Sequence, residues 1–469
     1  MSRKSIRITR ESEESIVAKK GETTKLIRAK GLCFNRVSEE GRDNRLGDLS
    51  TDEKVRELQK KLYLKAKQEA KFRFYALYDK VYRDDVLQCA WRQVRKNGGC
   101  GGVDRKEIKD IEAEGVANTL NEIHEELKTG RYQPQALRRV YIPKADGKQR
   151  PLSIPTIKDR IVQAAVKIII EPIFEADFED NSYAYRPKRS ANDAAEEIRK
   201  QLCYGNNQVL ETDLEDCFGS IPHKGMMDAV ARRIADGKIL KLIKAFLEAK
   251  IMEEGRTEKP TSGTPQGGVI SPLLANVYLD AIDKGWKPYQ WNARLIRYAD
   301  DLVILVKGAG VEKCKERLEG LIKGLGLKMK ESKTKIVDSR EAGFDFLGFT
   351  FRSAKSRRGR EAGYYYPSHK SENKIREKVR QITNYRKPVK AEEIIRELNP
   401  VMRGWVNYYK QGNSSKAFGK IKHYTAMSVR KFMRRRRGKS GYGWKEYTQE
   451  YLYEKLKLYS DYHVKWANA

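Results

Sequence analysis

The sequence predicts an α+β fold in which an antiparallel sheet is followed by a helical C-terminal region. Three features support this prediction. Short apolar runs separated by turn residues, at 138–155 and 293–306, predict paired strands. Longer stretches with apolar residues at three- and four-residue spacing predict helices. The chain beyond about Ala354 is basic, aromatic and mainly helical in pattern.

The charge of the chain indicates an anionic partner. Its 469 residues include 96 Lys and Arg against 64 Asp and Glu, a net charge of +32. Nucleic acid fits this excess best, because phosphate neutralisation drives its binding to basic proteins. No run of about 18 apolar residues occurs, so we expect no membrane span. The N-terminus lacks a secretory signal and the six cysteines form no C-x-x-C pair, so we expect reduced thiols and a cytoplasmic location.

The first part of the chain predicts an extension, a helical region, a hairpin and a buried helix. Residues 1–50 are polar and without periodicity, which is typical of a loosely ordered extension. Residues 51–87 have helical spacing. Asp146-Gly147 between two strand-like runs predicts a β-hairpin. The apolar stretch 159–174 predicts a buried helix that ends near Pro172.

The middle of the chain predicts strands that flank a glycine-rich loop. The segment NQVLETDLEDCF predicts a strand that runs into a turn. The segment GTPQGGVISPLLANVYLDAID predicts a loop followed by a helix, with Ser271 as its N-cap and Pro272 in its first turn. The segment FDFLGFTF predicts a further strand.

Asp300 and Asp301 lie side by side in RYADDLVIL, residues 297–305. Adjacent acids of this kind most often mark a turn, because Asp bonds its own backbone there. The alternative is a metal site, since carboxylates at a hairpin tip can hold Mg²⁺. Such a site needs a third acid, and Asp213 at the end of a predicted strand is the candidate. Spacing alone does not choose between Asp213 and its neighbours, which are Glu211, Glu215 and Asp216.

An ordered set of motifs surrounds these acids. It includes RRVYIPKADGKQRPLSIPTIKDRIVQ, SYAYRPKRSANDA, SGTPQGGVISPLLANVYLD, YADD, GLKMKESKTKIV, FDFLGFTF and LNPVMRGWVNYYKQG. In content and order the set resembles the group II intron-encoded reverse transcriptase/maturase family, over about Tyr75 to Tyr424. One Y-x-D-D motif alone would be weak support, whereas the ordered set is very specific.

The resemblance implies a right-hand polymerase fold with fingers, a palm that carries an antiparallel sheet, and a helical thumb continuous with an α-helical maturase domain. It divides the chain into an extension at 1–50, N-terminal helices and fingers at 51–200, a palm at 201–353, and a thumb and maturase region at 354–469. The implied activity is RNA-directed DNA synthesis, in which an RNA template is copied from a DNA primer with dNTPs.

The resemblance also implies roles for individual residues. Asp213, Asp300 and Asp301 correspond to the ligands of two Mg²⁺ ions roughly 3.5–4 Å apart, which activate a primer 3′-hydroxyl and stabilise the leaving pyrophosphate. Phe218 corresponds to an aromatic gate that would collide with a ribose 2′-hydroxyl, although plain core packing would also explain it. Gln266 corresponds to a nucleotide contact. The cations that would clamp the triphosphate are Lys144 and Arg150, with a solvated turn as the alternative. The residues that would face RNA or primer are Arg186, Lys333, Lys335 and Gly348.

The C-terminal region combines cations with aromatic rings. Residues 401–469 contain 16 Lys and Arg, 4 acids and 14 aromatic residues. Such interleaving suits structured or single-stranded RNA. The surface candidates are the four consecutive arginines Arg434, Arg435, Arg436 and Arg437. Trp405, Val406 and Tyr409 recur at helical spacing and are expected in the core instead. In the family that the chain resembles, this region grips the parent group II intron RNA and assists its splicing.

The chain departs from many family members near its end. It has no cysteine beyond Cys314, so we expect no C-terminal DNA-binding and endonuclease module, and hence an intron whose RNA inserts into a DNA target by reverse splicing. Two other functions stay open at this point. One is an RNA-binding splicing factor with an inactive polymerase, which the intact acids argue against. The other is a domesticated relative that serves DNA repair or phage defence.

Overall fold

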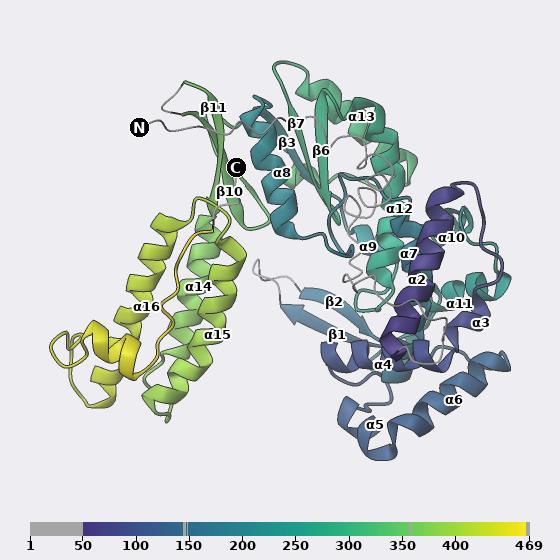
Figure 1. Ribbon diagram of the computed structural model, residues 1–469, viewed down its shortest axis with the longest axis horizontal. Helices are drawn as coiled ribbons and strands as arrows, with labels where there is room; N and C mark the ends of the chain where they lie inside the picture. The colour runs from purple at the N-terminus through teal and green to yellow at the C-terminus, as the bar shows by residue number, and fades with distance from the viewer. Residues whose placement is uncertain (1–49, 144–146, 148, 357–358, 466–469) are drawn as a thin grey trace, which may run out of the picture. The chain divides into compact units, whose positions relative to one another are not determined.

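The computed structural model describes residues 50–465 except 144–146, 148 and 357–358 (Figure 1). The chain folds into two compact units, and each draws on separate stretches of sequence. The first unit contains the described residues up to Arg189 together with Leu214–Gly285 and Gly320–Met329. The second contains Ser190–Asp213, Trp286–Glu319 and the described residues from Lys330 onward. The mixture of helices and strands confirms the predicted α+β class.

The first unit is mainly helical and centres on α7, Ile157–Glu175, whose residues are buried along most of its length. The helices α2, Thr51–Gln68, and α4, Asp84–Asn97, pack against it. The prediction that this helix ends near Pro172 is confirmed, because Pro172 lies in the last turn and the helix ends at Glu175. Proline removes the amide that would bond to the Ile168 carbonyl. That carbonyl accepts a hydrogen bond from Gln59 Nε2 at 3.0 Å instead, so it keeps a partner.

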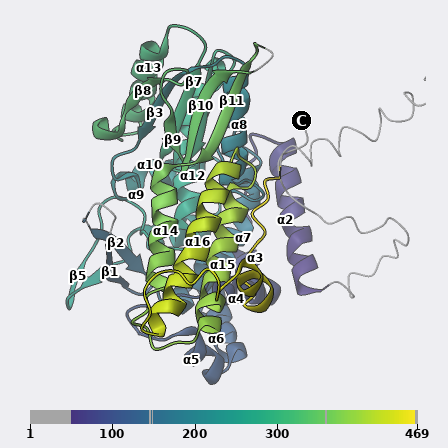
Figure 2. The same cartoon turned by 90° about the vertical axis from the view of Figure 1, so that its left-hand side faces the viewer.

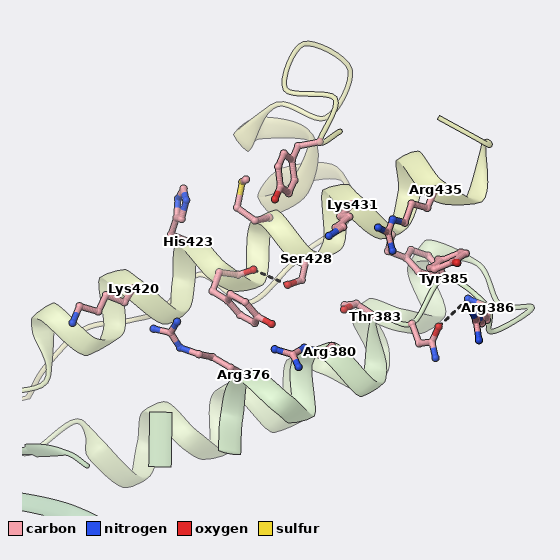
Figure 3. Close-up of a pocket in the computed structure, with 15 residues that line it drawn as sticks. Arg376, Arg380, Thr383, Tyr385, Arg386, Lys420, His423, Ser428, Lys431 and Arg435 are labelled. Carbon is pink, nitrogen blue, oxygen red and sulfur yellow. Dashed lines mark hydrogen bonds between the residues drawn. The ribbon is translucent and has the colours of Figure 1, made fainter. Parts of the chain in front are cut away.

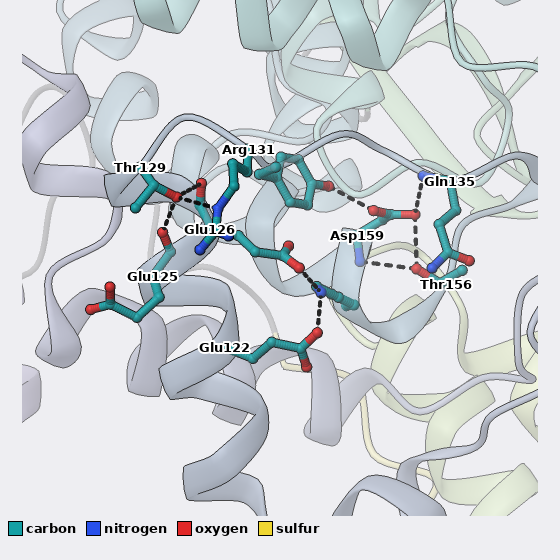
Figure 4. A network of polar contacts seen from close by, with 10 residues as sticks. Glu122, Glu125, Glu126, Thr129, Arg131, Gln135, Thr156 and Asp159 are labelled. Carbon is teal, nitrogen blue, oxygen red and sulfur yellow. Dashed lines mark hydrogen bonds and ion pairs between the residues drawn. The ribbon is translucent and has the colours of Figure 1, made fainter.

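A buried carboxylate organises the start of α7 (Figure 4). Asp159 accepts hydrogen bonds from Tyr132 Oη at 2.6 Å, from the Gln135 amide at 3.1 Å and from Thr156 Oγ1 at 2.8 Å. Thr156 in turn caps the helix by accepting from the Asp159 amide. The neighbouring Lys158 reaches acids of α6, Val116–Lys128. These bonds therefore position the segment that leads into the first strand.

The predicted hairpin is present as β1, Leu137–Pro143, and β2, Gln149–Ile154. The strands are antiparallel, and Pro143 pairs with Gln149 across the turn. Gly147 has φ 80°, a conformation that glycine adopts without cost. Lys144 lies outside the described residues. β1 also pairs with β4, Ile251–Glu253, which continues into β5, Arg256–Glu258.

The second unit contains an antiparallel sheet of four strands in the order β6-β7-β3-β8. Its strands are β3, Gln208–Asp213; β6, Ala293–Tyr298; β7, Asp301–Val306; and β8, Lys335–Asp338. β7 lies between β6 and β3, and the residues after Asp301 in this strand are all buried. The helix α8, Ala191–Cys203, packs against β6 and β7 (Figure 1). The prediction that residues 207–218 form a strand that runs into a turn is confirmed, since β3 ends at Asp213, and so is the predicted acidic hairpin.

The prediction of one strand in FDFLGFTF is wrong, because this segment turns at Leu347-Gly348 and forms two paired strands of a second sheet. Its strands are β9, Phe344–Phe346; β10, Phe349–Lys355; and β11, Glu361–Pro367, in the order β11-β10-β9. The turn between β9 and β10 uses Leu347 at φ 51° and Gly348 at φ 80°. Tyr408 Oη donates to the Leu347 carbonyl at 2.9 Å. A Cβ at position 348 would lie 2.7 Å from Tyr409 Oη, so this position requires glycine.

Three helices follow, α14, His369–Ile382; α15, Ala391–Tyr409; and α16, Ser415–Arg436 (Figure 2). They bury one continuous apolar core between them. Val406 is 2% exposed and Tyr409 is 5% exposed, while Trp405 packs against Tyr409 and Phe418. The expectation that these three residues belong to the core is confirmed.

The remaining elements connect these parts. The helices are α3, Tyr78–Val81; α5, Ile108–Glu114; α9, Cys217–Ser220; α10, His223–Ala231; α11, Gly237–Leu247; α12, Ser271–Trp286; and α13, Val311–Gly324. Short turns of other helix types are Lys287–Tyr289, Glu331–Lys333 and Tyr451–Lys455. Ser271 is the first helical residue of α12, within one position of the predicted cap.

Five cysteines fall within the described residues, and all five are free thiols, as expected. Cys33 lies outside the described residues. Of the helices in the described part of the chain, none combines the length and apolar character needed to cross a lipid bilayer.

Candidate active site

The acidic pair forms the tip and the first residue of a tight hairpin. β6 ends at Tyr298 and β7 begins at Asp301, which leaves Ala299 and Asp300 in the turn. Ala299 adopts φ 59°, and its carbonyl accepts from Nη1 of the buried Arg297 at 3.2 Å. The two explanations offered from the sequence, a turn and a metal site, therefore do not exclude each other, because both acids lie at the turn.

Asp213 is the third acid that the strand pairing brings to this tip. β3 ends at Asp213, which lies directly opposite Asp301 in the antiparallel register with β7. Directly opposed residues have Cβ atoms about 4.5–5.5 Å apart. The backbone of Asp213 is fixed from the other side, where its carbonyl accepts from the Lys330 amide at 2.8 Å.

The competing acids have other surroundings. Glu211 lies opposite Lys335 of β8, and burial raises its pKa to about 7. Glu215 and Asp216 are exposed and follow the end of β3. Asp216 has left-handed backbone geometry with φ 39°, so the strand does not continue through it. The register therefore favours Asp213 as the partner of Asp301.

The electrostatics of this site indicate crowded negative charge. The pKa of Asp301 is raised to about 6, first by burial and then by the negative charges of Asp300 and Asp213. Lys333 Nζ forms an ion pair with Asp213 Oδ2, and this contact raises the pKa of Lys333. A cation at the three carboxylates is stabilising, and the ammonium of Lys333 supplies one positive charge there.

The donor set of this site fits a hard divalent cation. Carboxylate oxygens are the ligands that Mg²⁺ takes in proteins. Among the described residues, however, no three Asp, Glu, His or Cys side chains lie close enough together to hold a metal ion in this arrangement. Asp213 and Asp301 are neighbours in the sheet, but the Lys333 ammonium contacts Asp213 in this arrangement.

These side chains line a cavity of about 610 Å³ in the second unit. Six residues named from the sequence meet there, namely Asp213, Asp301, Lys333, Lys335, Gly348 and the competing acid Glu211, whereas Asp300 is not among the lining residues. Sequence reasoning missed Asp345, Ser368 and Lys370, which also line it. Lys370 lies at the start of α14, and no local pattern distinguishes it from the many other lysines of the chain.

A separate cavity of about 310 Å³ lies within the first unit and is lined by Phe218 and Gln266. Phe218 is half-buried on the short helix α9, so its ring is not simply core. Its carbonyl accepts from the Thr264 amide at 2.7 Å. Gly263 has φ 83°, and a Cβ there would lie 2.7 Å from the Phe218 carbonyl oxygen. The glycine therefore allows the loop to approach Phe218 closely.

The loop that carries Gln266 is bonded to the β1–β2 hairpin. The Ser153 amide donates to the Gln266 carbonyl at 2.7 Å, and Arg139 Nη1 donates to Ser153 Oγ at 2.9 Å. Arg139 and Ser153 line the same cavity, and sequence reasoning missed both. Arg150 is exposed on β2 opposite Ile142 and is not among the residues that line the cavity.

Comparison with known proteins assigns these features to domains. Residues 142–351 match the reverse transcriptase (RNA-dependent DNA polymerase) family, and residues 372–452 match the maturase-specific domain of group II introns. Protein YkfC of Escherichia coli K12 is 35% identical over 345 residues, which covers 65% of this chain and 90% of YkfC. The chain belongs to the group II intron reverse transcriptase and maturase family.

Further relatives are encoded in introns. Group II intron-encoded protein LtrA of Lactococcus lactis subsp. cremoris is 40% identical over 213 residues, covering 45% of this chain and 35% of LtrA. The putative COX1/OXI3 intron 1 protein of Saccharomyces cerevisiae is 29% identical over 284 residues, covering 49% of this chain and 34% of that protein. The chain is thus a reverse transcriptase with a group II intron maturase domain, and it spans about a third of the length of these two relatives.

Arg186 lies within the reverse transcriptase match, but it does not face RNA. Its side chain is fully buried and forms two hydrogen bonds to the equally buried Glu175 carboxylate, at 2.9 and 2.7 Å. Nη1 also donates to the carbonyls of Glu179 and Ser182. The expectation that Arg186 binds RNA is therefore wrong. A guanidinium has five N–H donors, and at least four of those of Arg186 form hydrogen bonds within the protein.

The four consecutive arginines of the maturase-specific region are not equivalent. Arg434 is half-buried and bonds to Glu446 Oε1 at 3.0 Å and to the Ser440 carbonyl at 3.1 Å. Arg435 is exposed and lies over the Tyr385 ring at 5.0 Å. Arg436 and Arg437 are exposed at the end of α16. Three of the four are therefore accessible to RNA, while Arg434 supports the fold.

Proposed function

We propose that this reverse transcriptase synthesises DNA on an RNA template with two Mg²⁺ ions held by Asp213, Asp300 and Asp301. The observation that carries this proposal is the register of β3 and β7, which sets Asp213 opposite Asp301 beside the Asp300 turn. Asp213 and Asp301 line a cavity with Lys333 and Lys335, so cations that suit nucleic acid phosphates flank these two carboxylates. Bound Mg²⁺ would supply activation of a primer 3′-hydroxyl and stabilisation of the leaving pyrophosphate.

The protein's own groups have distinct tasks in this proposal. Asp213, Asp300 and Asp301 provide oxygen ligands at fixed positions, because strand register and a tight turn hold their backbones. Lys333 neutralises Asp213 before substrates arrive, and with Lys335 it contacts the phosphates of template or primer. Gly348 forms the β9–β10 turn on the wall of the same cavity, and the primer would lie against this turn.

We also propose that the first unit selects the nucleotide. Phe218 would exclude ribonucleotides by colliding with the 2′-hydroxyl, and its half-buried position on the wall of a cavity supports this role over core packing. Gln266 would contact the nucleotide from the same cavity wall. Arg150 and Lys144, on and beside the β1–β2 hairpin, would hold the triphosphate. Arg suits a phosphate because it can donate two parallel hydrogen bonds.

The proposed architecture is a right-hand polymerase with an extension at 1–50, N-terminal helices and fingers at 51–200, a palm at 201–353, and a thumb and maturase region at 354–469. The four-stranded antiparallel sheet supports the palm assignment, and the bundle of α14, α15 and α16 supports the helical thumb. The proposed partners are the parent group II intron RNA, a DNA target, an RNA template with its DNA primer, and dNTPs. The net charge of +32 supports these polyanionic partners.

The test replaces Asp300 and Asp301 together by Asn. Primer extension on an RNA template should be abolished, because the amides cannot supply the negative charge of the metal ligands. Binding of the intron RNA in a gel shift should persist, because most of the basic surface is untouched. Retained DNA synthesis in the double variant would overturn the assignment of the catalytic acids. Loss of RNA binding along with synthesis would instead point to misfolding, which thermal unfolding would detect.

A further inference from the structure

A groove of about 880 Å³ lies in the maturase region, between α14 and α16 (Figure 3). Its lining comes entirely from the second unit. Arg376 and Arg380 project from α14, and Lys420, Lys431 and Arg435 project from α16. The groove is distinct from the acidic cavity, since the two share no lining residue.

Sequence periodicity explains why both helices turn cations toward this groove. On α14, Arg376 and Arg380 are four residues apart and so lie on one face. Ile375, Val379 and Ile382 occupy the adjoining face and are buried in the bundle core. On α16, the buried Ile421, Val429 and Phe432 pack into that core, while the polar face looks into the groove. The groove therefore lies beside a fixed core, and its walls are well-formed helices.

The charges of the groove are strongly unbalanced. Six Lys and Arg residues line it, and no Asp or Glu does. In the described part of the chain, Arg380, Lys420 and Lys431 form no ion pair, while Arg376 reaches Glu372 only at 3.5 Å. Exposed ammonium and guanidinium groups held along two helix faces repel one another, and a polyanion relieves that repulsion.

Aromatic rings are interleaved with these cations. Tyr385 is 37% exposed beneath the Arg435 guanidinium, and Tyr442 is 38% exposed on the groove wall. Trp444, 51% exposed, lies beside Tyr442 with ring centroids 6.3 Å apart. His423 of the groove stacks on the same indole at 6.4 Å. Exposed rings that the core does not need are suited to stacking on bases.

We infer that this groove binds an unpaired segment of RNA, with its phosphates on the cations of α14 and α16 and its bases on Tyr385, Tyr442 and Trp444. The inference rests on the proposed function in one respect, that RNA is the partner. It goes beyond that proposal by locating the site and by specifying unpaired RNA. In a duplex the bases are already stacked on each other and cannot reach these rings.

The groove differs from the four consecutive arginines as a binding site. Of Arg434–Arg437, only Arg435 lines it, and the other cations come from positions that no charge run marks in the sequence. Asn384 and Arg386, in the loop after α14, also line the groove. The site is thus assembled from segments about 50 residues apart, which only the helical bundle brings together.

The experiment compares two double variants that remove the same charge. Arg380→Gln with Lys431→Gln alters the groove, and Lys374→Gln with Lys378→Gln alters exposed lysines of α14 outside it. Binding is measured by fluorescence anisotropy over a range of salt concentrations. The probes are a short unstructured RNA, its abasic counterpart and an RNA hairpin duplex.

The groove variant should bind the unstructured RNA more weakly, with a log–log salt slope lower by about 1.4, since each lost single-strand phosphate contact contributes about 0.7. The control variant should keep the wild-type slope.

Three outcomes would overturn the inference. Equal losses in both double variants would show a diffuse charge effect. If the wild-type protein bound the abasic strand as tightly as the strand with bases, the rings would have no role in binding. Tighter binding of the duplex, lost in the groove variant, would make the groove a duplex site. Primer extension on a short template separates this inference from the proposed function. Wild-type protein that fails to extend a primer refutes the polymerase proposal but still reports on the groove by anisotropy.

Discussion

Lys333 contacts Asp213 although the two residues are 120 positions apart in the sequence. The contact depends on β3, which ends at Asp213, and on the short turn at Glu331–Lys333 that precedes β8. A basic side chain therefore occupies one oxygen of a proposed metal ligand. Any cation that binds Asp213 through this oxygen has to compete with the ammonium.

Replacing Lys333 by Met should lower the Mg²⁺ concentration needed for half-maximal DNA synthesis. The Lys333 side chain is 55% exposed, so solvent screens the pair and its contribution is about 0.2–1 kcal/mol, up to about a fivefold change. Lys335→Met is the matched control, because Lys335 lines the same cavity but lies opposite Glu211. An unchanged or higher Mg²⁺ requirement in the Lys333 variant would show that the ion pair does not compete with metal.

Replacing Phe218 by Ala should allow ribonucleotides to be used. Removal of the ring opens the space that a 2′-hydroxyl would need, so the ratio of kcat/KM for dNTP over rNTP should fall. The control is Phe246→Leu, which changes a phenylalanine that is 2% exposed in the core of the same unit. If the ratio stays at the wild-type value while synthesis continues, Phe218 serves packing and the gate lies elsewhere.

Replacing Gly348 by Ala should lower the free energy of unfolding by about 1–3 kcal/mol, because a non-glycine residue at φ 80° is strained. The added Cβ would also lie 2.7 Å from Tyr409 Oη. Adding Tyr409→Phe to Gly348→Ala removes that oxygen, so this double variant should regain part of the lost free energy of unfolding. Gly404→Ala in α15 is the control, since no atom lies within 4 Å of its added Cβ and alanine favours the helix by about 0.5–1 kcal/mol. Denaturant unfolding measures all four proteins.

Replacing Arg186 by Met should destabilise the protein by about 3–5 kcal/mol, because Glu175 would be left charged and buried without its partner. Adding Glu175→Leu removes the stranded charge and should restore much of the stability. The salt dependence of RNA binding should be the same in the folded double variant as in wild type. If the double variant showed a lower salt slope of RNA binding than wild type, Arg186 would contribute to RNA binding after all.

Arg434 and Arg436 should respond differently to replacement by Gln. Arg434→Gln breaks bonds to Glu446 and to the Ser440 carbonyl, so the loss should be in stability, by about 1 kcal/mol. Arg436→Gln alters an exposed side chain and should leave stability unchanged while reducing the salt slope of intron RNA binding by about 0.7–0.9. The reverse pattern, with Arg434 affecting only RNA binding, would contradict the division between these two arginines.

Much of the fold followed from patterns that involve near neighbours in the sequence. Asp146-Gly147 predicted the β1–β2 hairpin, and apolar residues on either side of Asp300 predicted the second one. Trp405, Val406 and Tyr409 were correctly expected in the core, because their spacing places them on one helix face. Pro172 correctly marked the end of α7. The hydrogen bond from Gln59 to the Ile168 carbonyl could not be predicted, because Gln59 lies in a different helix, far away in the sequence.

The sequence by itself determined the local elements, the acidic turn and the resemblance to the family, because each depends on residues that are close along the chain or in a fixed order. Tertiary structure alone decided which charges are available. It buried Arg186 against Glu175, paired Lys333 with Asp213 and gathered the cations of α14 and α16 around one groove. The physical reason is that desolvation and ion pairing depend on neighbours in space. The linear sequence does not show which distant side chains become those neighbours.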